Sequence, residues 1–297
     1  MEWSRIKTII LIILVVTNVS LLGFLVQREL QAQNAQQEAR QNSIQFLENN
    51  GVTVEDSAVP EEMALLPQTV EWDREQERES ASVLLGGEVQ EQAWSDEIYR
   101  YYNEAGSIQF HRDGTFQGEF VEGAFQLEGQ DAAAYSLQVL EILGIQGESL
   151  SVQTDSGEDA AVTVVCRQLW NQVPVFNHLI TLTFRGDSLA AVEGRRLTGE
   201  PSLDSSQEPI SIPTALFQFY HGMAALGDVC SRIDSITPGY VTSAGTGPSA
   251  LTPVWYIATD FINCSYTTFT TCATCFKCFK IMFSFKIFYG FLHFLYI

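Results

Sequence analysis

Four cysteines near the C-terminus have a spacing that metal chemistry could use. Cys272, Cys275 and Cys278 are separated by two residues each, and Cys264 lies eight residues before the first of them. Thiolates at this spacing on a tight turn can share Zn²⁺ or an iron–sulfur cluster. No Gly or Pro shapes the chain between them, and aromatic residues surround them on all sides. We therefore expect no metal site here.

The segment that carries these cysteines, residues 261–297, differs in composition from the rest of the chain. It contains no Asp or Glu, so all 36 acidic residues lie upstream. It is rich in Phe, Lys, Ile and Tyr, as AT-rich codons would encode, which favours a frameshift or a run into foreign sequence. Its apolar run 287–297 is too short for a second membrane helix, which needs about 20 residues. We predict that this Phe/Cys-rich tail is not part of the fold.

The histidines offer no obvious catalytic arrangement. His111, His178, His221 and His293 fall on different expected elements, and none has a partner at metal-ligand or acid–base spacing. His178 in a strand and His221 in a helix are typical of structural histidines. The sequence has no glycine-rich phosphate loop, His-Glu-x-x-His or Gly-x-Ser-x-Gly motif. We predict a protein that is not an enzyme and that has no cofactor and no metal ion.

Charge and cysteine content further limit the classes of partner and of covalent cross-link that we expect. The chain of 297 residues has 36 acidic and 16 basic side chains and a net charge of −20. Such a surface repels phosphates, which argues against binding to nucleic acid or to anionic headgroups. Only Cys166 and Cys230 precede the tail, too few for a disulfide framework. Cys166 lies in an apolar strand-like segment and should be buried.

The N-terminus is typical of a membrane anchor. Arg5 and Lys7 precede an uncharged run from Thr8 to Val26, which is about the length that spans a bilayer as a helix. Because basic residues tend to stay in the cytoplasm, we expect residues 1–7 inside, residues 8–26 as a transmembrane helix and the main domain outside. A cleaved signal peptide is the alternative, but its apolar core would be shorter and would end in small residues.

Polar and small residues interrupt this apolar run at four positions, and we expect them to contact a partner helix. Side-chain hydrogen bonds between membrane helices contribute about 0.6–2 kcal/mol each, and glycine allows close approach. Asn18 has an alternative role as a merely tolerated residue, since polar side chains can bond to their own helix backbone. The four residues are Thr17, Asn18, Ser20 and Gly23.

Beyond the anchor, the pattern predicts an α+β protein. A helical stalk over 27–50 should stop at Asn49-Asn50-Gly51. Alternating strands and turns predict two antiparallel meanders, each accompanied by helices. Helices are expected over 76–85, 131–143 and 212–226, and strands over 63–72, 97–102, 107–111, 115–121, 161–170, 175–184, 188–197, 229–240 and 251–259. The recurrence suggests a duplicated α+β unit, with a first extracytoplasmic unit over 51–130 and a second over 131–260.

Three stretches resemble the YycI-like regulatory proteins of the YycFG (WalRK) two-component system. The N-terminus Met-Glu-Trp-Ser-Arg-Ile-Lys-Thr-Ile, with Asn18 further on, is similar to the start of these proteins. The segments Trp170–Phe176 and Leu251–Ile257 look like strands of their extracytoplasmic domain. The resemblance covers residues 1–260, but the final hairpin that usually follows the Pro-Val-Trp strand is replaced here by the tail.

This resemblance implies a fold of two PepSY-like units of antiparallel sheet with packed helices. It also implies a non-catalytic regulator that acts, with a YycH-like protein, on a sensor histidine kinase of the YycG (WalK) type that controls cell-wall metabolism. There are no catalytic residues to carry over. Because PepSY-like units also occur in protease propeptides, an anchored or secreted peptidase-inhibitory module is the alternative function, and a hydrolase without a known motif is a third.

Overall fold

A computed structural model describes residues 2–60, 65–155, 161–204, 210–226, 229–243 and 248–260. These residues form a mixed α+β protein with four α-helices and a large, mainly antiparallel sheet, which confirms the α+β prediction. The described residues divide into two compact units. Unit 1 comprises residues up to 59, 211–235 and 258–260, and unit 2 comprises residues 60–210 and 236–257. The tail with Cys264, Cys272, Cys275 and Cys278 lies outside the described residues.

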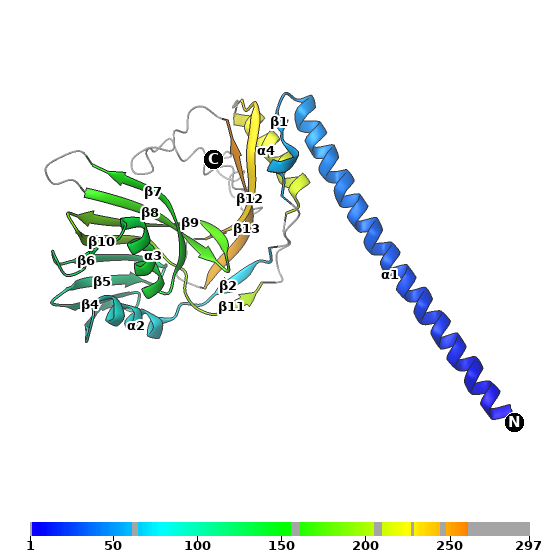
Figure 1. The fold of residues 1–297 in the computed structure, drawn as a ribbon, viewed down its shortest axis with the longest axis horizontal. Coiled ribbons are helices and arrows are strands. Elements are labelled where there is room, and N and C mark those ends of the chain that lie inside the picture. Colours follow the sequence, from blue (N-terminus) through cyan, green and yellow to red (C-terminus); the bar gives the residue numbers. More distant parts are fainter. Residues whose placement is uncertain are drawn as a thin grey trace, which may run out of the picture. The chain divides into compact units, whose positions relative to one another are not determined.

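Unit 2 is built on a sheet in which ten strands follow one another in the order β11-β2-β13-β12-β9-β10-β6-β5-β4-β3, while β8 and β7 branch from β9 (Figure 1). Its helices are α2 (Arg74–Leu84) and α3 (Ala132–Ile142). Its strands are β2 (Gln68–Val70), β3 (Gln90–Ser95), β4 (Ile98–Asn103), β5 (Gly106–His111), β6 (Thr115–Phe120), β7 (Gln146–Thr154), β8 (Ala161–Trp170), β9 (Val173–Arg185), β10 (Ser188–Arg195), β11 (Pro201–Leu203) and most of β12 (Arg232–Thr242) and β13 (Ser249–Thr259).

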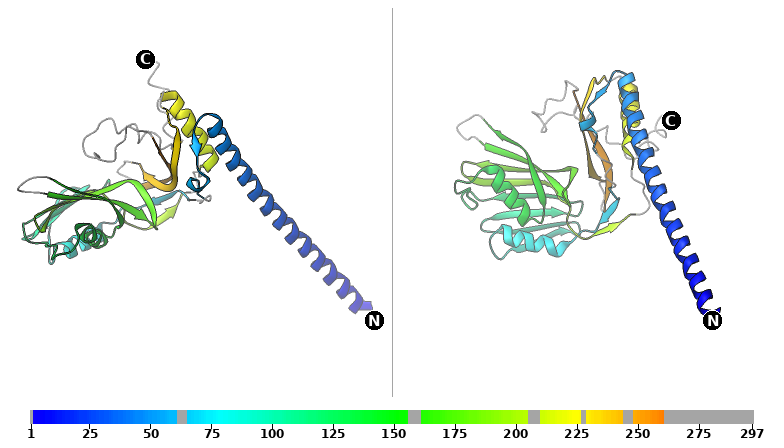
Figure 2. Two further views of the ribbon diagram at one scale, coloured as in Figure 1. Left: turned by 45° about the horizontal axis from the view of Figure 1, so that its top comes forward. Right: turned by 45° about the vertical axis from the view of Figure 1, so that its right-hand side comes forward.

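The two helices of unit 2 start at capping aspartates. The carboxylate of Asp73 accepts hydrogen bonds from the backbone N–H groups of Glu75 and Gln76, at 3.0 and 3.2 Å. Asp131 does the same for the first turn of α3. These bonds satisfy N–H groups that a helix start leaves unpaired. Both helices lie on the same face of the sheet (Figures 1 and 2), where they bury an apolar core.

That core takes alternate side chains from strands β4, β5, β6, β8, β9 and β10. Tyr101, Ile108, Phe110, Ile180 and Phe184 are buried between the sheet and the two helices. Their neighbours along each strand point to the other face, which neither helix covers, as the strand period of two requires. Unit 2 therefore has one apolar face under its helices and one polar, half-exposed face.

The expected boundary between residues 130 and 131 falls inside unit 2. Strand β6 of the first meander pairs with β10 of the second, with Ala191 opposite Glu119 and Val192 opposite Gly118. Backbone pairing thus joins the two meanders into one sheet. Three strands of unit 2, β3, β7 and β11, occur where the sequence pattern predicts none.

Unit 1 contains α1 (Glu2–Asn49), β1 (Thr53–Val54), the 3-10 turn η1 (Asp56–Ala58) and α4 (Ile212–Leu226), together with the first residues of β12 and the last of β13. Strand β1 pairs in parallel with β12, with Thr53 opposite Arg232. The carboxylate of Asp260 accepts hydrogen bonds from Ser231 Oγ at 2.6 Å and from the backbone N–H of Arg232 at 2.9 Å. These contacts tie the last described residue into the unit.

Candidate functional site

Helix α1 combines an apolar segment with a packed C-terminal end. Among the described helices it is the one long and apolar enough to cross a membrane, and a window of 18 residues in it has a mean hydropathy of 1.5. Its 48 residues correspond to about 72 Å at 1.5 Å per residue. Large apolar side chains at positions 10, 11 and 13–26 are exposed, as expected of a surface that faces lipid. A signal sequence meets the same criterion of length and composition.

The four expected contact residues lie on two sides of this helix. Successive residues of a helix are rotated by about 100° around its axis, so Thr17, Ser20 and Gly23 lie within an arc of about 120°. Asn18 lies outside this arc, about 100° from Thr17 on the side away from Ser20. Thr17 Oγ1 donates to the backbone oxygens of Ile13 and Leu14, and Asn18 Nδ2 donates to that of Leu14 at 2.8 Å. Thr17 and Asn18 thus each donate a hydrogen bond to the backbone of α1, which leaves both the partner contact and the tolerated role open for Asn18. A Cβ at Gly23 would meet nothing within 4 Å.

The opposite end of α1 is fixed by packing within unit 1. Ser43, Ile44 and Leu47 are buried. Phe46 packs against two aromatic rings of α4, those of Phe217 and Tyr220, with ring centroids 4.6 and 5.2 Å away. Such contacts hold the last turns of α1 in a defined orientation on α4.

The uncovered face of the sheet in unit 2 carries a row of polar side chains. Each strand contributes one residue that lies opposite its neighbour in the register. The row runs across six strands through Gln92, Arg100, Gln109, Gln117, Glu193 and Thr181. Because these residues come from separate strands, the sequence shows them only as the polar positions of alternating patterns.

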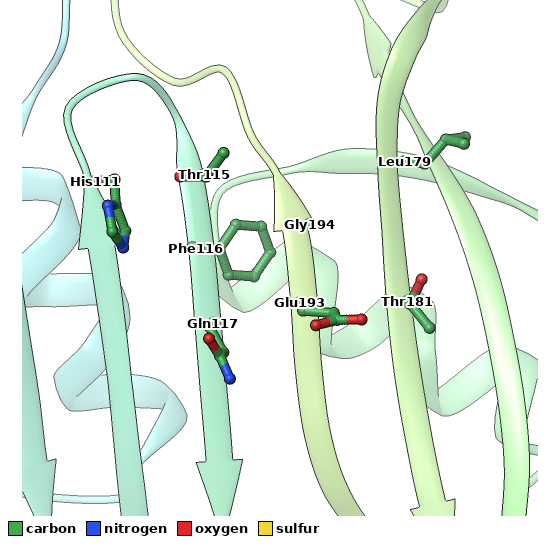
Figure 3. Close-up of a pocket in the computed structure, with 8 residues that line it drawn as sticks. All are labelled: His111, Thr115, Phe116, Gln117, Leu179, Thr181, Glu193 and Gly194. Atoms are coloured by element: carbon green, nitrogen blue, oxygen red, sulfur yellow. The ribbon is translucent and has the colours of Figure 1, made fainter. Parts of the chain in front are cut away.

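A shallow pocket of about 330 Å³ lies on this face, between the ends of β5, β6, β10 and β9 (Figure 3). Residues lining it include His111, Gln117, Thr181 and Glu193. The two titratable side chains, His111 and Glu193, come from strands that flank β6, so their backbones are about 10 Å apart by strand spacing. Among the described residues no hydrogen bond or ion pair joins them, and His111 Nε2 instead lies 2.7 Å from Gln109 Nε2. The pocket offers hydrogen-bonding groups but no activated nucleophile.

His178 is buried in a hydrogen-bonded network that fixes it as neutral. Its Nδ1 lies 3.0 Å from Gln168 Oε1 and its Nε2 lies 2.7 Å from Thr242 Oγ1. The Gln168 amide also bonds to both backbone groups of Leu197, at 2.6 and 2.8 Å, and this assigns Oε1 as an acceptor. Nδ1 therefore donates, and Nε2 accepts from the hydroxyl group. Burial and the charge of Arg195 lower the pKa of His178 to about 3. The expected structural role of His178 is confirmed.

A buried ion pair is the other polar cluster of unit 2. Arg196 Nη2 lies 3.1 Å from Glu77 Oε1, and both side chains are 3% exposed. Trp72 Nε1 donates to the same carboxylate at 2.6 Å, and Arg196 Nη1 donates to the carbonyl oxygen of Leu143 at 3.2 Å. Burial raises the pKa of Glu77, and the charge of Arg196 and the Trp72 hydrogen bond oppose the rise. The pair links α2 to the chain after β10.

The remaining nucleophilic and metal-binding candidates are structural or lie elsewhere. Cys166 and Cys230 are free and buried, as expected for Cys166, and burial raises the pKa of the Cys166 thiol to about 11. A thiol with this pKa is a poor nucleophile at neutral pH. Within the described residues, no group of three or more His, Cys, Asp or Glu side chains could hold a metal ion.

Comparisons with known proteins add a distant structural similarity. No protein-family model matches the sequence, and no curated protein matches it. The structure is similar to the crystal structure at 1.45 Å of an uncharacterized protein from Eubacterium rectale ATCC 33656. The TM-score is 0.45 and the identity 7%, over 74% of this chain and 84% of that chain.

Proposed function

We propose that this chain is a non-catalytic, membrane-anchored regulator of a sensor histidine kinase of the YycG (WalK) type that controls cell-wall metabolism. In this proposal it acts together with a YycH-like protein, with residues 1–7 in the cytoplasm, residues 8–26 in the membrane, and unit 2 and the rest of unit 1 outside the cell. The observation that carries the proposal is the continuity of α1, which runs as one helix from the apolar segment to the packed residues Ile44 and Leu47.

This continuity supplies a mechanism. A helix without a break transmits rotation and displacement along its length, so an event at Phe46 on α4 reaches the membrane segment, and the reverse holds as well. Within the membrane, the side defined by Thr17, Ser20 and Gly23 is where a kinase helix could approach most closely. A difference of about 1.4 kcal/mol between two kinase states changes their ratio tenfold, so one or two contacts of this kind suffice.

The PepSY-like identity of the extracytoplasmic region belongs to the same proposal. An antiparallel sheet with helices on one face, as in unit 2, fits such units. Its uncovered face, with Gln117, Thr181 and Glu193, would then be the surface on which outside signals or the YycH-like partner act.

Exchange of membrane-segment residues tests the contact. The triple variant Thr17→Val, Ser20→Leu and Gly23→Leu should reduce co-purification of the kinase from membranes at least tenfold. Leu22→Ala, about 140° from Thr17 on the other side of the helix, is the matched control and should leave co-purification unchanged. Full association and full kinase regulation in the triple variant would contradict the proposal.

Alanine insertions test the mechanical continuity separately. One alanine inserted after Gln33, where the helix is exposed, rotates the membrane segment by about 100° relative to Phe46. Seven alanines rotate it by about 700°, which is within 20° of the original phase. Kinase regulation should be lost with one alanine and retained with seven. If regulation is the same for all insert lengths, α1 is a tether and not a transmitter.

A further inference from the structure

The pocket on the uncovered face of unit 2 contains a carboxylate that the protein itself does not use. Glu193 is the one acidic side chain among the residues that line the pocket. It lies on β10, opposite Gln117 of β6 on one side and Thr181 of β9 on the other (Figure 3). The Glu193 side chain is exposed, and within the part of the chain that the structure describes no hydrogen bond or ion pair holds its carboxylate. The pocket therefore presents an acceptor for a positive charge.

The cations closest to this carboxylate along the sheet are held by other acidic groups. Arg195 follows Glu193 by two residues on the same strand, and its guanidinium pairs with Asp113 at 3.8 Å. Arg167 of β8 donates to the carboxylate of Glu148 at 2.5 and 2.9 Å. Neither pair neutralises Glu193, and the chain as a whole has a net charge of −20. Charge complementarity therefore favours a ligand that brings a cationic group to the pocket.

The neighbours of Glu193 in the sheet can assist in binding such a group. Thr181 and Gln117 each have a side-chain oxygen that accepts hydrogen bonds. Side chains directly opposite each other on neighbouring strands have Cβ atoms about 4.5–5.5 Å apart. One ammonium or guanidinium group can therefore donate to the carboxylate and to one of these oxygens together.

The shape of this surface favours an extended protein segment over a small molecule. Small-molecule sites bury roughly 70–90% of their ligand, whereas this pocket is shallow and open. Beyond the pocket, the row of polar side chains continues across three more strands through Gln117, Gln109 and Arg100. The two glutamine amides both donate and accept hydrogen bonds, so they can bind the N–H and C=O groups of a polypeptide backbone.

We propose that the pocket at Glu193 receives a lysine or arginine side chain from an extended segment of a partner protein, which lies across β10, β6, β5 and β4. The inference rests on the proposed function, in which the same face receives outside signals or a partner, and it adds the chemistry of what binds there. The ion pair with Glu193 fixes the position of the segment, and the amides of Gln117 and Gln109 bind its backbone.

Peptide binding to the full-length protein in detergent tests this site. The probes are two fluorescent peptides with blocked ends, one of alternating threonine and lysine and one with glutamate in place of each lysine. Anisotropy is measured at about 0.15 M salt, where attraction to distant surface charges is screened. Glu193→Gln should weaken binding of the lysine peptide about tenfold, because a charge-assisted hydrogen bond is lost. Glu141→Gln removes an exposed carboxylate of α3, on the other face of the sheet, and should change the affinity less than twofold.

A charge exchange distinguishes this ion pair from general attraction to an acidic protein. Glu193→Lys should bind the glutamate peptide at least tenfold more tightly than the wild type does, whereas Glu141→Lys should not. Arg100→Gln should leave binding of the lysine peptide unchanged. Circular dichroism checks folding, which substitution of exposed side chains should preserve.

Four outcomes would overturn the proposal. They are failure of the wild type to bind the lysine peptide, a preference for the glutamate peptide, equal weakening by Glu193→Gln and Glu141→Gln, and binding of lysine amide alone as tightly as the peptide. The last result would assign the pocket to a small cation. No kinase takes part in these measurements, so a loss of kinase regulation with intact peptide selectivity would count against the proposed function alone.

Discussion

Acidification should destabilise unit 2 through His178. The imidazole is buried, donates to Gln168 and accepts from Thr242. A proton added to Nε2 would remove the acceptor for the Thr242 hydroxyl and would place a charge in a site that excludes water. The nearby charge of Arg195 opposes protonation as well, and the pKa of His178 is about 3 instead of the usual 6.5.

The sign and size of the effect follow from linkage. Because the folded pKa lies below the unfolded one, the unfolded chain takes up the proton first as the pH falls. Stability is fully present above pH 6.5 and is lost progressively between pH 6.5 and pH 3. At pH 5 the unfolded state gains about 2 kcal/mol relative to pH 7 from this residue alone.

Urea unfolding of the full-length protein in detergent, followed by tryptophan fluorescence at pH 7 and pH 5, measures this term. The wild type also loses stability through carboxylates, so the informative quantity is its difference from His178→Gln, which cannot take up the proton. The free-energy loss between the two pH values should be about 2 kcal/mol smaller in His178→Gln. His221→Gln, which removes an exposed histidine of α4, is the control. An equal loss in wild type and His178→Gln, or an NMR titration midpoint of His178 near 6.5, would refute the reasoning.

Three further predictions concern the other buried or clustered groups. Arg196→Met should destabilise unit 2 by about 3–5 kcal/mol because it leaves the Glu77 carboxylate buried without its partner. Adding Glu77→Leu to this variant should recover most of the lost free energy of unfolding. If the effects of the two substitutions on chemical denaturation are strictly additive, Arg196 and Glu77 do not interact. Cys166, whose thiol pKa is raised to about 11 by burial, should resist iodoacetamide at pH 8 until urea unfolds the chain, as peptide mass spectrometry would reveal; labelling at the rate of a free thiol in native protein would be incompatible with its burial. Hydrogen bonds, first of all from Ser231, lower the pKa of Asp260 to about 2. The stabilising effect of the ionised Asp260 carboxylate should therefore be complete above pH 4 and lost as the pH falls through 2. Asp260→Asn should remove that acid transition, and an unchanged transition would assign it to other carboxylates.

Local pattern was enough to predict most individual elements. The helix expected over 212–226 is α4, and the strand expected over 161–170 is β8. Such elements carry an alternation or periodicity of apolar residues, because one face of each is buried. Strands β3 and β7 lack this signal since they lie at edges where few side chains are buried. The segment Gln90–Ser95 shows no alternation of apolar and polar residues.

The division of the chain into structural units could not be predicted from local pattern. Two similar runs of strands suggested two units, but alternation says nothing about which strands pair. The pairing of β6 with β10 depends on residues some 70 positions apart, such as Glu119 and Ala191. The same limit applies to sites: His178 could be assigned a structural role from its strand, whereas its contact with Thr242 could not be foreseen.

The buried polar residues of unit 2 share one property that bears on function. Glu77 binds Arg196, His178 binds Thr242, and Gln168 binds the backbone of Leu197, so each joins segments that are distant in the sequence. His178, held in this way, does not take up a proton near neutral pH, because its pKa is lowered to about 3. These buried polar groups of the described chain therefore help to define one arrangement of strands.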